Sequence, residues 1–178
     1  MILVDWQIRK DIEDKHIGIS PFSEELLNPS SLDVRLGNKF GVVKAQYEHI
    51  DPLDPYSFHT EEIESDSWIL GPGGSVLGVL LEEISLPDDT SAYLKGKSSL
   101  GRLFLDNSSF ACWIDPGWAG SLVIELANHS SNSIILTAGM KIGQLVFERH
   151  EVVDTPYGEK KTSKYHNQSG MTGSKGIS

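Results

Sequence analysis

Short runs of apolar residues, or of alternating apolar and polar residues, recur along most of this chain. The runs that predict β-strands are residues 31–37, 75–86, 90–96, 112–115, 121–126 and 141–150. They are separated by the turn-forming clusters NPSS, GPGG, LPDD, DPGWAG and TAGM. Residues 4–15, in which Ile8 and Ile12 recur at helical spacing among charges, predict one short N-terminal helix. Many short strands with frequent turns indicate a mainly β fold, a sandwich or barrel, rather than βαβ units.

The length of the chain and a change of composition near its end bound its organisation. At 178 residues it fits a single domain with its own core. From residue 158 the sequence becomes polar and carries four lysines against one glutamate, although the whole chain has a formal charge of −10. This composition is typical of a disordered end, but a cationic arm on an acidic body also suits closure over an anion. We therefore expect a β domain over residues 1–157 and a flexible arm over residues 158–178.

Charge, hydropathy and cysteine content exclude several classes of function. The acidic charge disfavours broad contact with nucleic-acid backbones, although a small anion in a local cationic pocket remains compatible with it. No run reaches the roughly 18 apolar residues of a membrane span, and the start lacks the long apolar region of a signal peptide, so we expect a cytoplasmic protein. Cys112 is the one cysteine, which excludes an internal disulfide and every multi-cysteine zinc site. The six histidines show no ligand spacing.

The segment KGKSSLGR, residues 95–102, contains a Gly-Lys-Ser that resembles the end of a phosphate-binding loop. A Walker A loop requires a glycine five positions before Gly96, where this chain has Ser91, and it requires an α/β context that the predicted strands do not supply. Ser98 and Ser99 instead follow a strand at the start of a short predicted helix, where hydroxyls and free backbone N–H groups suit a phosphate. Arg102 then lies one turn further on the same side. The alternative interpretation is an ordinary helix start with solvated surface charges.

The segment from residue 111 to residue 126 predicts two strands joined by a turn at residues 116–120. The simplest hairpin puts residues 115, 113 and 111 opposite 121, 123 and 125. The side chains that then share one face are Trp113, Asp115, Val123 and Glu125. Glu125 is a carboxylate in an otherwise apolar strand, which is costly unless it has a purpose. The alternatives are a turn-initiating role for Asp115, an edge-strand charge for Glu125, and a register slipped by one residue.

Long motifs in this order and at these spacings resemble the dCTP deaminase family of the dUTPase-like superfamily. The motifs are MILVDWQIRKDI, NPSSLDVRLGNKF, GKSSLGR, WIDPGW, LVIELAN, GMKIGQLVF and PYGEKKTSKYHNQSG, and together they cover nearly the whole chain. The resemblance implies a distorted β-barrel of the dUTPase-like, β-clip type, assembled as a homotrimer with active sites at subunit interfaces. It also implies dCTP and dUTP as substrates, Mg²⁺ as a cofactor bound through the triphosphate, and dTTP as an inhibitor of some members.

The resemblance also implies roles for individual residues. Glu125 is the implied catalytic acid and base, with Arg102 near the reacting base and Asp115 on the sugar 3′-hydroxyl. Trp118 is expected to pack under the deoxyribose. The implied nucleotide-binding set is Lys97, Ser98, Ser99, Arg102, Ala111, Trp113, Asp115, Trp118, Tyr157, Lys164 and Gln168. A carboxylate in place of zinc agrees with the cysteine count, because zinc deaminases hold their metal with cysteines. Desolvation of Glu125 is expected to raise its pKa toward working pH.

The family divides into members that only deaminate dCTP and members that also hydrolyse the triphosphate to dUMP and pyrophosphate. An aromatic residue before Ile-Asp is typical of the second group, and Trp113 holds that position, so we expect both activities, with Asp115 also orienting the second attacking water. Phe110 and Cys112 depart from the usual residues of the base-contacting loop, and Lys97 replaces a common arginine. The alternatives are a monofunctional deaminase that releases dUTP, a dUTPase alone, and a non-catalytic nucleotide-binding regulator.

Overall fold

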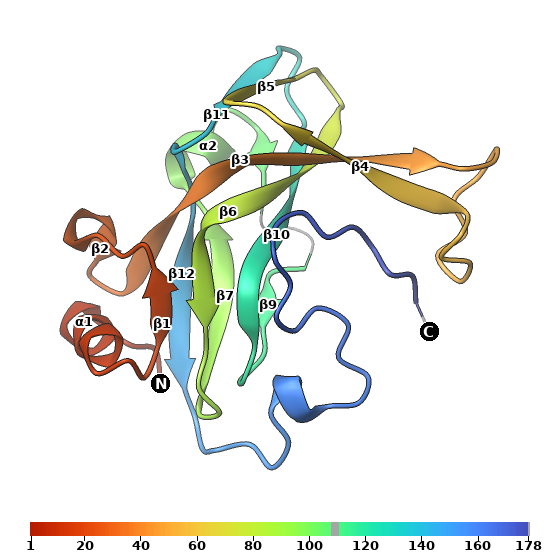
Figure 1. Cartoon of the computed structure of the whole chain (residues 1–178). Helices are drawn as coiled ribbons and strands as arrows, with labels where there is room; N and C mark the ends of the chain where they lie inside the picture. Colours follow the sequence, from red (N-terminus) through yellow and green to blue (C-terminus); the bar gives the residue numbers. More distant parts are fainter. Residues whose placement is uncertain (108–110, 178) are drawn as a thin grey trace.

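The computed structural model describes residues 1–107 and 111–177, and Figure 1 traces its helices and strands. The helical segments are α1 (Asp5–Glu13), η1 (Glu24–Leu26), α2 (Ser98–Gly101) and η2 (Tyr157–Glu159). The strands are β1 (Gly18–Ser20), β2 (Leu27–Asn28), β3 (Ser31–Ala45), β4 (Phe58–Glu64), β5 (Ser67–Leu70), β6 (Ser75–Ser85), β7 (Thr90–Gly96), β8 (Leu105–Asp106), β9 (Trp113–Ile114), β10 (Ala119–Asn128), β11 (Ile134–Thr137) and β12 (Lys141–Arg149).

In this part of the chain a ten-stranded sheet forms most of the molecule. Its main path runs β8-β10-β6-β3-β12-β7-β9, with β1 paired to β6 and with β2 and β4 paired to β3. The strands β5 and β11 form a separate two-stranded sheet. The long sheet curls, so that β9 at one end of the path lies beside β10 near the other end (Figure 1). The prediction of a mainly β, barrel-like fold with one short N-terminal helix is confirmed.

Alternation along β10 separates the core from the site. Ile124 and Leu126 are almost fully buried and join the hydrophobic core with residues such as Leu36 and Phe147. Successive side chains of a strand point to opposite faces, so the residue between them, Glu125, points away from this core. The Glu125 carboxylate is therefore separated from the aliphatic interior.

The predicted hairpin between residues 111–115 and 121–125 is wrong. Strand β9 pairs with β7, where Trp113 lies opposite Tyr93, whereas β10 pairs with β6, where Glu125 lies opposite Leu77. The turn that joins β9 to β10 carries the chain from one end of the curled sheet to the other instead of folding it back on itself. The two strands face each other across a cavity, which preserves the predicted gathering of their side chains.

The C-terminal segment runs back over the outside of β10 (Figure 1). Ser121 donates its backbone N–H to the carbonyl of Gln168 at 2.9 Å, and the Gln168 side chain donates to the Ser121 carbonyl at 2.8 Å. Asn167 donates its backbone N–H to the Ala119 carbonyl at 2.8 Å. The segment is therefore docked on the sheet, and the flexibility expected of it stays a prediction. Among the described residues, no helix has the length and apolarity needed to cross a membrane.

Candidate active site

A cavity of about 450 Å³ lies between β9, β10 and the C-terminal segment. The residues of the predicted nucleotide-binding and catalytic sets that line it are Ala111, Trp113, Asp115, Trp118, Glu125, Tyr157 and Gln168. Apolar side chains that include Leu77, Leu122 and Val123 form much of the remaining wall. A mostly apolar hollow with a few convergent polar groups is the usual form of a small-molecule site. The fold thus gathers lining residues from Val43 to Ser174, which are 131 positions apart in the chain.

Glu125 is the half-buried carboxylate of this cavity. Burial raises the pKa of its carboxyl above the ordinary value of 4.5, while hydrogen bonds with the backbone of Glu125 itself and of Ala111 oppose part of that rise. Desolvation disfavours the charged form, which is why the net shift is upward. The contact with Ala111 agrees with the predicted proximity of residues 111 and 125, although no ladder joins their strands. An upward shift of its pKa makes a carboxyl better suited to accept a proton and to return it.

Asp115 lies at the mouth of the same cavity and is exposed. The indole N–H of Trp113 donates to its Oδ1 at 2.8 Å. The Trp113 ring packs edge-on against Tyr93 of β7, with ring centroids 4.7 Å apart, which holds the indole in place. The Trp113 indole thereby orients the Asp115 carboxylate.

Trp118 forms a buried wall of the cavity and joins the sheet to the C-terminal segment. Its side chain is 5% exposed, and its indole N–H donates to the carbonyl of Tyr165 at 3.1 Å. The hydroxyl of Tyr157 accepts hydrogen bonds from the backbone N–H groups of Lys164 and Tyr165. The ammonium of Lys164 donates to the Gly176 carbonyl at 2.8 Å and does not line the cavity. Of the three nucleotide-binding residues predicted near the C-terminus, Tyr157 and Gln168 therefore reach the cavity directly, whereas Lys164 does not.

The predicted phosphate-binding residues of α2 do not line this cavity. Ser98, Ser99 and Arg102 are exposed at the short helix, in a stretch that also exposes Leu103 and Phe104. The predicted helix turn at the serine pair is confirmed, because α2 spans Ser98–Gly101. These groups are available on the surface of the chain rather than beside its own Glu125.

Lys97 differs from the other members of this set because its ammonium already has a partner. It donates to the buried carboxylate of Asp33 at 2.5 Å. The sequence alone did not indicate this pair, because 64 positions separate the two residues. Tyr165 was also missed as a lining residue, although its place beside Lys164 in the C-terminal motif was a usable signal.

Of the two unusual residues in the base-contacting loop, the structure describes one. Phe110 lies outside the residues that the structure describes. Cys112 is half-buried against the hydrophobic core, and its carbonyl accepts a hydrogen bond from the Leu94 N–H at 2.9 Å. Cys112 thus packs as a small apolar residue at the edge of the core. Within residues 1–107 and 111–177, no group of three His, Cys, Asp or Glu side chains is arranged to hold a metal ion.

Comparison with known proteins adds a family to this geometry. A family model described as dCTP deaminase-like matches residues 2–150. A protein named dCTP deaminase, dUMP-forming, from Methanospirillum hungatei JF-1 is 45% identical over 174 residues, which cover 97% of this chain and 94% of that protein. A protein of the same name from Corynebacterium kroppenstedtii is 47% identical over 181 residues, which cover 98% of this chain and 97% of that protein.

Solved structures agree on the fold. A 2′-deoxycytidine 5′-triphosphate deaminase from Agrobacterium tumefaciens superposes with a TM-score of 0.66 and 27% identity, covering 86% of this chain and 50% of that longer chain. A mutant dUTPase from phage phi11 of S. aureus superposes with a TM-score of 0.51 and 13% identity, covering 78% of this chain and 93% of that one. The likeness to the phage enzyme concerns the fold alone, and it confirms the predicted dUTPase-like architecture.

Proposed function

The chain belongs to the dCTP deaminase-like family, and from this premise we propose that it deaminates dCTP and hydrolyses the triphosphate to dUMP and pyrophosphate. The observation that carries the proposal is one cavity that contains both a half-buried carboxylate, Glu125, and a second carboxylate, Asp115. The dUMP-forming names of relatives at about 45% identity, which cover nearly the whole chain, support the dual activity.

Glu125 performs the proton transfers of the deamination. Its carboxylate removes a proton from water as the oxygen forms a bond to carbon 4 of cytosine. The protonated Glu125 passes this proton to the ring nitrogen. It then takes the proton of the new hydroxyl on carbon 4 and delivers it to the amino group, so that ammonia leaves as the carbon–nitrogen bond breaks and the oxygen becomes the carbonyl of uracil. A carboxyl whose pKa is raised by burial suits both directions of transfer.

Asp115 serves the sugar and the second reaction. Its carboxylate accepts a hydrogen bond from the 3′-hydroxyl and orients the water that attacks the α-phosphorus. The bond between this phosphorus and the oxygen that bridges to the β-phosphate breaks, and pyrophosphate leaves. Trp118 packs under the deoxyribose, where an added 2′-hydroxyl would clash, so the buried indole favours deoxynucleotides. Ala111 and Trp113 complete the wall on the base side.

The remaining phosphate ligands come from a neighbouring copy of the chain in a homotrimer. The groups that do not line the cavity of their own chain but are accessible or partly accessible at the surface are Ser98, Ser99, Arg102 and Lys97. A neighbouring copy that brings α2 to the cavity adds hydroxyl and cationic groups for the triphosphate. Arg102 then lies near the reacting base, where it helps to position the water and limits the rise in the pKa of Glu125.

The C-terminal arm, residues 158–178, closes over the bound nucleotide. Tyr157 and Gln168 already line the cavity, and the Gln168 Oε1 atom is buried without a hydrogen-bond partner in the described part of the chain, which fits a ligand contact. Lys164 contributes charge to the triphosphate. Mg²⁺, when bound to the phosphate oxygens, neutralises part of their charge.

Two finer points belong to the same proposal. We expect dTTP to compete for this site, with the loop that contains Phe110 and Cys112 adjusting base choice and feedback. A cytoplasmic location, expected from the sequence, also remains part of the proposal.

The test is an incubation of the purified protein with dCTP and Mg²⁺, followed by separation of the products. Ammonia, dUMP and pyrophosphate in equal amounts support the proposal. Ammonia with dUTP would indicate a deaminase alone. A second incubation contains dUTP in place of dCTP. Release of dUMP from dUTP without any turnover of dCTP would indicate a dUTPase alone, and binding without turnover of either nucleotide would indicate a regulator.

A further inference from the structure

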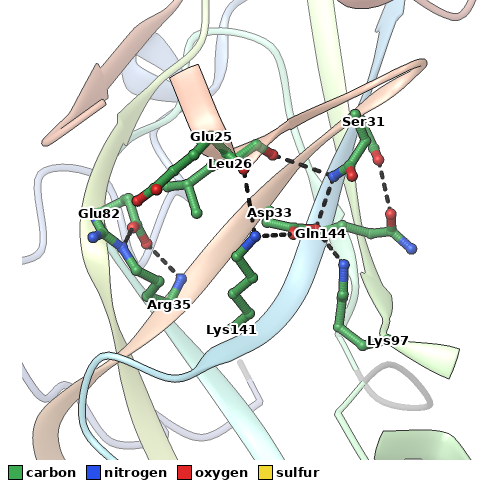
Figure 2. A network of polar contacts seen from close by, with 10 residues as sticks. Glu25, Leu26, Ser31, Asp33, Arg35, Glu82, Lys97, Lys141 and Gln144 are labelled. Carbon is green, nitrogen blue, oxygen red and sulfur yellow. Dashed lines mark hydrogen bonds and ion pairs between the residues drawn. The ribbon is translucent and has the colours of Figure 1, made fainter. Parts of the chain in front are cut away.

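Asp33 is a buried carboxylate outside the catalytic cavity, and the reactions described above do not use it. It lies on β3 with 2% of its surface exposed. Its Oδ1 accepts hydrogen bonds from Lys97 at 2.5 Å and from Asn28 at 2.9 Å, and its Oδ2 lies 3.1 Å from the ammonium of Lys141 (Figure 2). Burial raises the pKa of this carboxyl, but these three partners outweigh burial and hold the pKa below its ordinary value. Asp33 is therefore a fixed negative charge.

A buried charge at position 33 makes the fold less stable than an apolar residue of similar size would. Even a well-paired buried ion pair contributes little or nothing to stability relative to apolar residues of the same volume. The cluster of Asp33, Lys97 and Lys141 also keeps more positive than negative charge, because two ammonium groups share one carboxylate. Its position, rather than its stability, indicates what it does.

The cluster holds the chain directly before the serine pair. Lys97 is the residue that precedes α2, and its carbonyl accepts the N–H groups of Leu100 and Gly101 at 3.0 and 2.9 Å. The preceding carbonyl, that of Gly96, accepts a hydrogen bond from the Gln144 side chain at 3.2 Å. Gln144 is itself held by the hydroxyl of Ser31 at 2.8 Å (Figure 2).

Two side chains from β3 and β12 thus fix two consecutive residues at the end of β7. A helix of four residues, such as α2, does not hold its own conformation in water, because helix nucleation is unfavourable. The position of Ser98 and Ser99 therefore depends on these anchors.

We propose that Asp33 is a positioning residue for triphosphate binding, which holds the Lys97 ammonium and the serine pair that follows it in the arrangement that receives the phosphates. The inference rests on the proposed function, in which Lys97, Ser98 and Ser99 bind the triphosphate. An ammonium has three donors, so Lys97 can bond Asp33 and still donate to phosphate. The Lys97 side chain is 26% exposed, which leaves it within reach of a ligand.

The test separates the phosphate part of the ligand from the nucleoside part. Isothermal titration measures the binding of tripolyphosphate with Mg²⁺, and separately of deoxycytidine, to the full-length protein and to Asp33→Asn. We expect Asp33→Asn to weaken tripolyphosphate binding by about tenfold, the size of one misplaced charged contact, and to leave deoxycytidine binding unchanged.

Glu82 provides the matched control. It is a fully buried carboxylate in the same sheet, and it accepts hydrogen bonds from the backbone N–H and the Nε of Arg35 at 2.8 and 2.7 Å (Figure 2). Glu82→Gln removes a buried charge of the same kind away from α2. We expect this variant to lower the melting temperature while leaving the ratio of the two affinities as in the wild type.

Three outcomes decide the inference. A loss confined to tripolyphosphate in Asp33→Asn, absent from Glu82→Gln, supports it. Equal losses for both ligands, or the same pattern in both variants, would overturn it and make Asp33 a stability element. If Asp33→Asn does not fold, Asp33→Glu carries the same test, because it keeps the charge but displaces the carboxylate. Turnover of dCTP to dUMP by the wild type alongside such a negative result would leave the proposed function intact.

Discussion

The indole N–H of Trp113 donates a hydrogen bond of 2.8 Å to the carboxylate of Asp115. Both residues line the cavity that also contains Glu125. The donor sits on a ring that is braced by Tyr93, so it restricts the orientation of the carboxylate rather than following it. This contact gives a physical reason for an aromatic donor at the position before Ile114 and Asp115 in a protein that hydrolyses as well as deaminates.

Replacing Trp113 with phenylalanine keeps the packing against Tyr93 but removes the hydrogen bond. Because Asp115 is proposed to orient the water that attacks the phosphate, we expect dUMP formation from dUTP to fall by about tenfold, as for one lost hydrogen bond to a charged group. Ammonia release from dCTP should fall less. Separate measurement of the two rates checks this split, and equal losses in both would show that Trp113 acts on binding alone.

The raised pKa of Glu125 predicts how stability depends on pH. Folding favours the protonated form of this carboxyl, so its favourable contribution is complete below its unfolded pKa and is lost as pH rises through the folded pKa. Glu125→Gln stays neutral at every pH. The melting temperature of the variant should therefore rise relative to that of the wild type over the pH range above the ordinary carboxyl pKa of 4.5. A difference that is constant across this range would mean that the carboxyl is solvated as in the unfolded chain.

Docking of the C-terminal segment depends on the absence of a side chain at Gly120. This glycine has a φ of +137°, and a Cβ there would lie 2.7 Å from the carbonyl oxygen of Gln168. Gly139 offers a control, because it also has a positive φ, +84°, but a Cβ there would meet nothing within 4 Å. Both alanine variants should lose about 1 kcal/mol or more of stability from backbone strain.

Gly120→Ala alone should also weaken dCTP binding, since it displaces the segment that carries Gln168. Titration with dCTP in a form that is not turned over, for example in the Glu125→Gln background, measures the effect. If Gly139→Ala weakens binding to the same extent, the docked segment is not the cause.

Truncation before Lys164 removes the docked part of the arm altogether. Lys164, Tyr165 and Gln168 are lost together, and the Trp118 indole loses its hydrogen-bond partner. We expect the affinity for dCTP to fall by more than about tenfold, because several contacts to a charged ligand disappear at once. Deoxycytidine, which has no phosphate, should lose less affinity. An unchanged affinity for dCTP would mean that the arm has no part in binding.

The sequence predicted the positions of the strands better than it predicted which strands pair with each other. The runs at residues 75–86, 90–96 and 141–150 became β6, β7 and β12 because hydrophobic periodicity and flanking turn formers are local signals. Strand β4 was missed, since its Thr60 to Glu64 stretch is acidic and largely exposed and resembles a solvated segment. Strand β4 is stabilised by its hydrogen-bonded pairing with the far end of β3, although its local sequence does not favour a strand.

The sequence predicted which side chains gather at the candidate site, but it did not predict how the strands that carry them are paired. The proximity of Glu125 to Ala111 was predicted from a hairpin that does not form, because strand pairing depends on how the whole sheet curls, and the two residues meet across the cavity instead. The pair between Asp33 and Lys97 carries no sequence signal, since neither residue breaks a local pattern. Long-range polar contacts of this kind become visible only in the folded chain.

The central claim is that Glu125 carries the protons of deamination. Its most direct test is the rate of ammonia release from dCTP by Glu125→Gln, with dCTP affinity measured on the same preparation. We predict that the rate falls by at least about 100-fold, as for the loss of a general acid and base, while the affinity stays within a few fold of the wild type. Release of ammonia at the wild-type rate by a folded Glu125→Gln protein would contradict the account.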